Sequence, residues 1–153
     1  MDYEPGDLVI IDDPIKVIQR NPTLYGGASP RGARLAAALA RDLIEQGDLP
    51  VTVDRVAGWW FITCEKDWLA GAGEDEAAHW FRMIPNPASG PEAIRPEILL
   101  TAFASGLFTA GPARTLHWIV KGIEMPPRLT SRVRRLLASN FGGRAVGFTA
   151  DPA

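Results

Sequence analysis

The sequence predicts an α+β fold, a two-layer sandwich with helices on one face of a small mixed or antiparallel sheet. Two observations predict it. Short runs rich in β-branched and aromatic residues lie near both ends and in the middle of the chain, and amphipathic helical stretches separate them. The expected order is therefore strand, two helices, hairpin, helices, strand, which is typical of this class. With 153 residues, 46% of them hydrophobic, we expect a single domain spanning residues 1–153.

The first part of the chain is expected to form a strand followed by two helices. Residues 8–11 are a short β-type run. A short helical stretch follows at 15–20, and Pro22 prevents its continuation. Residues 30–46 predict a long helix, because leucine and alanine recur there at helical spacing. Gly47 can end this helix in a left-handed conformation.

A β-hairpin is expected next. Residues 51–56 and 59–65 are the predicted strands, and the two residues between them, Ala57-Gly58, are a typical hairpin connection. Alternation along the second strand places two sets of side chains on opposite faces: Trp60, Ile62 and Cys64 on one, and Trp59, Phe61 and Thr63 on the other. Both sets include large apolar groups. One face is therefore expected to be core, and the other to lie under a helix, a ligand or a partner.

The second half of the chain has less regular signals. Four prolines between residues 85 and 96 indicate a loop or flap. The run TLHWIV favours a helix, with a strand as the alternative. The expected elements are a short helix at 74–83, a nearly all-apolar buried helix from Pro96 to Phe108, a helix at 115–120, a helix that begins at Thr130, and a closing strand at 144–149.

Charge is distributed unevenly. Residues 1–13 contain five acids and no base, whereas residues 126–150 contain five arginines and no acid. We expect these two ends to attract each other or to form solvated faces. The net charge is only −2, so no overall field draws the chain to nucleic acid, and we do not expect a nucleic-acid partner.

Composition also limits metals and compartments. The single cysteine, Cys64, excludes an intrachain disulfide and a cysteine zinc cluster. Two histidines are too few for a histidine-rich metal centre, so we expect no metal and no cofactor. The acidic start of the chain does not resemble a signal peptide. The longest charge-free run, 98–113, is shorter than the roughly 20 residues of a membrane span. We therefore expect a cytoplasmic protein without a membrane partner.

Residues 18–27, IQRNPTLYGG, resemble the arginine-proline-glycine-methionine-tyrosine-isoleucine-glycine signature of the DNA gyrase B and topoisomerase IV ATPase domain. This domain belongs to the superfamily of Hsp90, MutL and histidine kinases. The residues in register are Pro22, Leu24, Tyr25 and Gly27, with Arg20 just upstream, whereas Thr23 and Gly26 depart from the pattern. In the family the signature leads into the helix that carries the ATP-site glutamate and asparagine. Residues 97–109 are similar to the stretch before the gyrase ATP lid.

The departures from this family concern its chemistry. Leu39 aligns with the general-base glutamate, Leu43 lies near the magnesium-binding asparagine, and Asp42 aligns with the neighbouring aspartate. The expected aspartate-x-glycine-x-glycine turn is replaced by residues 62–68, which contain no glycine. Magnesium requires oxygen ligands and water attack requires a positioned base, and leucine supplies neither. The resemblance therefore implies a degenerate ATPase fold.

Two functions of different classes are compatible with this resemblance. The first is a non-catalytic, gyrase-B-like pseudo-ATPase module that binds a protein partner or a small ligand, with gyrase itself a partner by analogy. The second is an enzyme or ligand carrier that reuses the former nucleotide cavity for a small apolar molecule. A divergent ATP-binding domain is a third alternative. Each of these functions is compatible with a homodimer.

Candidate site residues follow from these functions. The residues expected to line a ligand site are Leu39, Asp42, Leu43, Cys64, Trp60 and Tyr25. The candidates for acid–base chemistry are Glu65, Asp67, Glu76 and His79. Glu76 and His79 are three residues apart and could share a helix face as an acid–base pair. The alternative for His79 is a half-exposed residue beside aromatic core. Five tryptophans fit either a ligand pocket or core packing.

Overall fold

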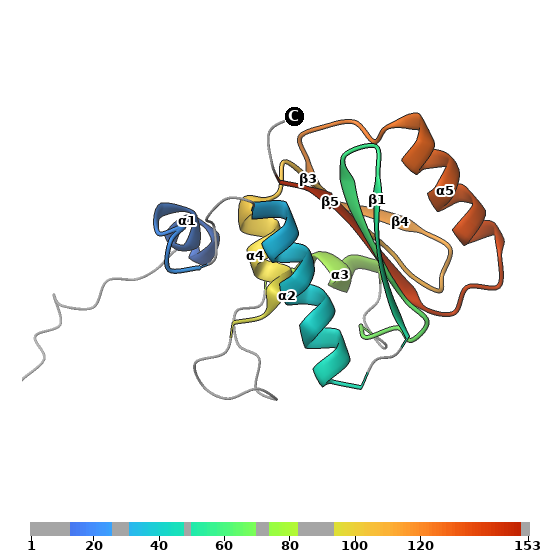
Figure 1. The fold of residues 1–153 in the computed structure, drawn as a ribbon, viewed down its shortest axis with the longest axis horizontal. Helices are drawn as coiled ribbons and strands as arrows, with labels where there is room; N and C mark the ends of the chain where they lie inside the picture. Colours follow the sequence, from blue (N-terminus) through green and yellow to red (C-terminus); the bar gives the residue numbers. More distant parts are fainter. Residues whose placement is uncertain (1–12, 26–30, 48–49, 70–73, 83–93, 151–153) are drawn as a thin grey trace, which may run out of the picture.

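The computed structural model describes residues 13–25, 31–47, 50–69, 74–82 and 94–150. Figure 1 shows an antiparallel sheet between two groups of helices. The elements are α1 (Pro14–Arg20), α2 (Arg31–Glu45), β1 (Val51–Val56), β2 (Trp59–Cys64), α3 (Glu74–Trp80), α4 (Pro96–Phe103), β3 (Gly106–Ala110), β4 (Leu116–Lys121), α5 (Pro127–Ala138) and β5 (Arg144–Thr149). The α+β class is confirmed.

The last strand of the chain lies in the middle of the sheet. The strand order is β1-β2-β5-β3-β4, and each neighbouring pair is antiparallel. Consequently β5 pairs with β2 on one side and β3 on the other, and its residues from Arg144 to Phe148 are buried. The predicted closing strand is confirmed, with the bounds expected from the sequence.

The hairpin between β1 and β2 is also confirmed. Ala57 and Gly58 have φ values of 51° and 87°, and positive φ at both central residues is characteristic of the type I′ turn that joins two-residue hairpins. The two faces of β2 separate as predicted. Ile62 and Cys64 belong to one apolar cluster, whereas Trp59 and Phe61 belong to another.

Helices cover both faces of the sheet. The face that bears Ile62 and Cys64 is covered by α2 and α4, and α1 packs against α4 within the same apolar cluster. On the opposite face lies α5 (Figure 1), whose Leu129 and Val133 pack with aromatic side chains of β2 and β3. The expected two-layer sandwich with helices on one face is corrected at this point. Because β2 and β3 carry large apolar groups on both faces, both faces must be covered.

Two element assignments from the sequence were wrong. The apolar helix expected from Pro96 to Phe108 ends at Phe103, and a fully buried strand, β3, begins at Gly106. A continuous apolar run does not distinguish a buried helix from a buried strand. The stretch 115–120, where a helix was preferred, forms the edge strand β4. Pairing with β3 and contact with both apolar clusters select the strand there.

The remaining helices are close to expectation. α2 ends before Gly47, whose φ is 78°, and α1 is held to α4 by a hydrogen bond from Gln19 Nε2 to the Ala102 carbonyl, 2.8 Å. α3 is shorter than predicted, and α5 begins before Thr130. The predicted strand 8–11 and most of the proline-rich stretch 85–96 lie outside the described residues. None of the described helices has the length and apolarity required to cross a membrane.

Candidate functional site: an open groove between β2 and α5

Three of the six predicted ligand-site residues belong to one apolar cluster, and two more pack against it. Leu39, Leu43 and Cys64 are 0% exposed members, and Tyr25 and Trp60 are partly buried against the cluster. α2 therefore directs the face that bears the two leucines into the core. In the structure these residues are part of the hydrophobic core or pack against it.

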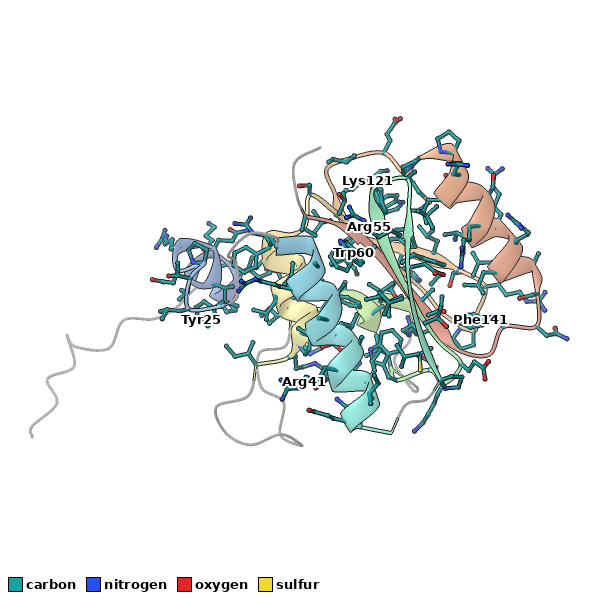
Figure 2. The ribbon with its side chains drawn as sticks, in the orientation of Figure 1. Tyr25, Arg41, Arg55, Trp60, Lys121 and Phe141 are labelled. Carbon is teal, nitrogen blue, oxygen red and sulfur yellow. The ribbon has the colours of Figure 1, made fainter. Side chains whose placement is uncertain are left out.

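The remaining three residues of this set, Asp42, Trp60 and Tyr25, are less buried than the three core members. Asp42 is half-buried on α2, and its Oδ2 accepts a hydrogen bond from Gln46 Nε2, 2.6 Å. The guanidinium of Arg55 lies 4.7 Å from the Trp60 ring centroid. Figure 2 shows Trp60 next to Arg55 at the sheet, and Tyr25 at the α1 end of the molecule. Trp60 and Tyr25 thus approach the cluster from different sides of α2.

Asp67, one of the predicted acids, forms a buried ion pair with Arg144. The guanidinium donates to both carboxylate oxygens, with Nε–Oδ1 at 2.5 Å and Nη2–Oδ2 at 3.3 Å. Nη1 also donates to Thr109 Oγ1, 3.1 Å. Arg144 is only 5% exposed. Two-pronged charge-assisted bonding of this kind orients both groups firmly, so Asp67 connects the segment after β2 to the central strand.

A second polar cluster, which the sequence did not predict, includes Trp68, the residue that follows Asp67 in the chain. Glu97 is 1% exposed at the start of α4. Its Oε1 accepts from Trp68 Nε1 at 3.2 Å and from Arg95 Nη2 at 3.0 Å. The Arg95 guanidinium lies 4.8 Å from the Trp80 ring centroid. A single glutamate that opens an otherwise apolar helix was the signal available in the sequence.

The remaining acid–base candidates are not gathered into one site. His79 is exposed on α3, and Glu65 is exposed just after β2. The side chain of Glu76 lies outside the described part, so the Glu76–His79 pair stays a prediction. Within the described ranges, no group of three or more histidine, cysteine, aspartate or glutamate side chains is arranged to hold a metal ion.

The described surface has two adjoining hollows between β2 and the end of α5. One, of about 370 Å³, is lined by Phe61, Thr63, Arg132, Arg135, Leu136 and Ser139. The other, of about 400 Å³, is lined by Glu65, Ser139, Asn140, Phe141 and Gly142. They share Ser139, and we refer to them together as the β2–α5 groove. Figure 2 shows Phe141 below the end of α5, beside the sheet.

Charges are arranged in order along the groove. Arg132 forms an ion pair with Asp54 of β1, and its guanidinium lies 5.7 Å from the Phe61 ring centroid. Arg135, one turn further along α5, is exposed. No side-chain hydrogen bond or ion pair to Arg135 is present among the described residues. Glu65 lies in the second hollow. The groove therefore has a cationic part and, beyond Ser139, a carboxylate.

Sequence reasoning named the parts of this groove without joining them. The sequence places arginines on the last helix, and it predicts that one face of β2, without indicating which, lies under a helix, a ligand or a partner. Only the packing of Leu129 and Val133 on the sheet brings Arg132 and Arg135 beside Phe61.

Comparison with known proteins gives no match: no family model, curated protein or solved structure matches the chain. The similarity of residues 18–27 to the gyrase B signature stays a resemblance in sequence.

Proposed function

We propose that this chain is a non-catalytic binding module of gyrase-B-like ancestry that recognises a protein partner. One contrast supports the proposal. The α2 face that the resemblance assigns to ATP packs into the core, whereas the β2–α5 groove is open and combines apolar with charged groups.

The α2 side of this contrast concerns Leu39 and Leu43. Both are 0% exposed and pack with side chains of the sheet, including Ile62 and Val146. A magnesium–nucleotide complex requires oxygen ligands and room for a polyphosphate. Fully buried leucine side chains offer no polar atom to a nucleotide, and a charge placed among them without a partner would be strongly unfavourable.

The groove side of the contrast concerns composition. Protein interfaces are enriched in arginine and aromatic residues, which supply charge-assisted hydrogen bonds and apolar area. Arg132 and Arg135 lie beside Leu136 in one hollow, and Phe141 lies in the adjoining one. This mixture favours a protein partner.

The alternative of an enzyme or carrier for a small apolar ligand is less well supported. Such a ligand, placed in the former nucleotide cavity, would have to displace Leu39, Leu43 and Cys64 from the core cluster. Removing three such side chains from close packing costs several kcal/mol, on the order of the stability of a whole domain.

A nucleotide titration tests the proposal. The purified chain is titrated calorimetrically with a non-hydrolysable ATP analogue, with and without magnesium, and phosphate release from ATP is followed in parallel. We expect no magnesium-dependent heat at millimolar nucleotide and no turnover above the protein-free rate. Saturable magnesium-dependent binding, or hydrolysis that follows the protein concentration, would refute the pseudo-ATPase proposal in favour of a divergent ATP-binding domain.

A further inference from the structure

We infer that the β2–α5 groove binds a protein segment that presents an acidic side chain next to an apolar one. This inference rests on the proposed function as a binding module and specifies the chemistry of the partner. Four features support it: an available cation, apolar side chains in both hollows, a helix that carries arginines and no acid, and a carboxylate in the second hollow.

The available cation is Arg135. Its neighbour Arg132 is engaged by Asp54 and held against the Phe61 ring. Arg135 lines the same hollow, is exposed, and has no ion-pair partner within the described part of the chain. A guanidinium presents a planar set of donors that matches a carboxylate in two-pronged geometry. An acidic side chain of the partner would therefore pair with Arg135.

Apolar side chains lie beside this cation. Phe61 lines the first hollow but is only 1% exposed, so the accessible apolar surface comes from Leu136 in that hollow and Phe141 in the second, both half-buried. Volumes of about 370 and 400 Å³ are at the lower end of the range of ligand sites. They suit single side chains of an extended segment, one of them apolar.

The charge of α5, which lines one side of the groove, is of one sign. The helix carries four arginines and no acid, and all four are exposed. Such a surface attracts acidic partners and increases their association rate.

The two acids along the groove favour a protein over a nucleic acid. Asp54 lies beside Arg132, and Glu65 lies in the second hollow. A continuous phosphate backbone would meet both carboxylates, whereas a peptide can place a single acid at Arg135 and a neutral or basic residue near Glu65. The overall net charge of −2 agrees with this choice.

The experiment selects peptides with the intact chain. The full-length protein is immobilised and used to select from a phage-displayed library of random 12-residue peptides at near-physiological salt. We expect enriched sequences that pair Asp or Glu with a neighbouring Leu, Ile, Phe or Trp. The most enriched sequence is then synthesised with a fluorescent label, and its Kd is measured by anisotropy.

Two variants locate the binding. Arg135→Glu replaces the available cation with an acid, and we expect the Kd of the labelled peptide to rise about tenfold or more, the effect of roughly 1.4 kcal/mol. Arg134→Glu is the matched control. It makes the same charge change at an exposed position of α5 outside the residues that line the groove, and we expect the Kd to stay within about twofold, as for a rim charge screened by salt. Circular dichroism confirms that both variants fold.

Several outcomes would overturn the inference: no enrichment, enriched sequences without acids, or equal weakening by both variants. Displacement of the peptide by a single-stranded oligonucleotide that binds more tightly would assign the groove to nucleic acid. Displacement by a synthetic peptide of residues 1–13, at higher affinity, would assign it to the chain's own acidic segment. These results are independent of the nucleotide titration, so failure of this inference and failure of the proposed function are distinguishable.

Discussion

At the scale of single residues, the Asp67–Arg144 ion pair is a tightly constrained polar contact. Both side chains are largely removed from water, at 13% and 7% exposure, so their desolvation is offset only by good geometry. The two-pronged contact and the hydrogen bond to Thr109 provide it. Gly111 leaves room for it, because a Cβ there would lie 2.7 Å from Arg144 Nη2.

We predict that Asp67→Asn lowers the free energy of unfolding by about 3–5 kcal/mol, because it leaves the charge of Arg144 buried without a counter-ion. Urea denaturation measures the change. Glu45→Gln is the control: it removes the Arg41–Glu45 pair, whose side chains are 79% and 58% exposed. The hydrogen bond and charge of Glu45 raise the pKa of Arg41, yet solvent screens this pair and we expect no measurable loss. Similar midpoints for wild type and Asp67→Asn would contradict the structural role of the buried pair.

At the scale of elements, local signals were sufficient where one periodicity dominated. The hairpin 51–64 was predicted because two alternating runs flank a two-residue turn with glycine. The run 96–110 was misassigned because buried helices and buried strands are both continuously apolar. The helix α4 and the strand β3 are separated at Ala104, which is extended with ψ of 141°. The strand then begins at Gly106, where a Cβ would lie 2.6 Å from the Trp59 ring.

Substitutions at the two positions of the hairpin turn are expected to change the free energy of unfolding in opposite directions. Ala57 has φ of 51°, a conformation that asparagine tolerates better than alanine. We expect Ala57→Asn to raise the free energy of unfolding by about 0.5–1 kcal/mol. Thermal and urea unfolding measure it.

Gly58→Ala serves as the comparison for this turn. Gly58 has φ of 87° and no atom within 4 Å of a Cβ built on it. The expected destabilisation, about 1 kcal/mol, therefore comes from backbone strain alone. If both substitutions changed stability in the same direction, the type I′ assignment would be wrong.

At the scale of the whole molecule, β5 connects the two apolar clusters. Val146 and Phe148 face α2 and α4, whereas Ala145 faces α5. Gly147 lies between Val146 and Phe148 in the strand and faces Phe108 of the α5-side cluster. A Cβ on Gly147 would be 2.2 Å from the Phe108 ring. The close approach of this strand to Phe108 lets the α5-side cluster pack densely at the centre of the sheet.

We therefore predict that Gly147→Ala is destabilising by about 1–3 kcal/mol, because the methyl group forces Phe108 out of its packed position. The loss of near-ultraviolet circular dichroism from the aromatic cluster, with the unfolding midpoint, measures it. Gly142→Ala is the matched control, since no atom lies within 4 Å of its Cβ and the residue is exposed. We expect a change within about 0.5 kcal/mol there. Equal stability of both variants would mean that β5 and Phe108 are not closely packed.

The sequence by itself determined the α+β class, the long helix that ends just before Gly47, the hairpin and the last strand, because each depends on periodicity or turn chemistry within a few residues. Only the tertiary structure decided that β5 lies in the middle, that 116–121 is a strand, and that α5 covers the second face. It also paired Asp67 with Arg144, 77 residues apart, and placed Arg135 beside Phe61 in one groove. These features depend on which distant segments exclude water together, and local sequence patterns do not encode that choice.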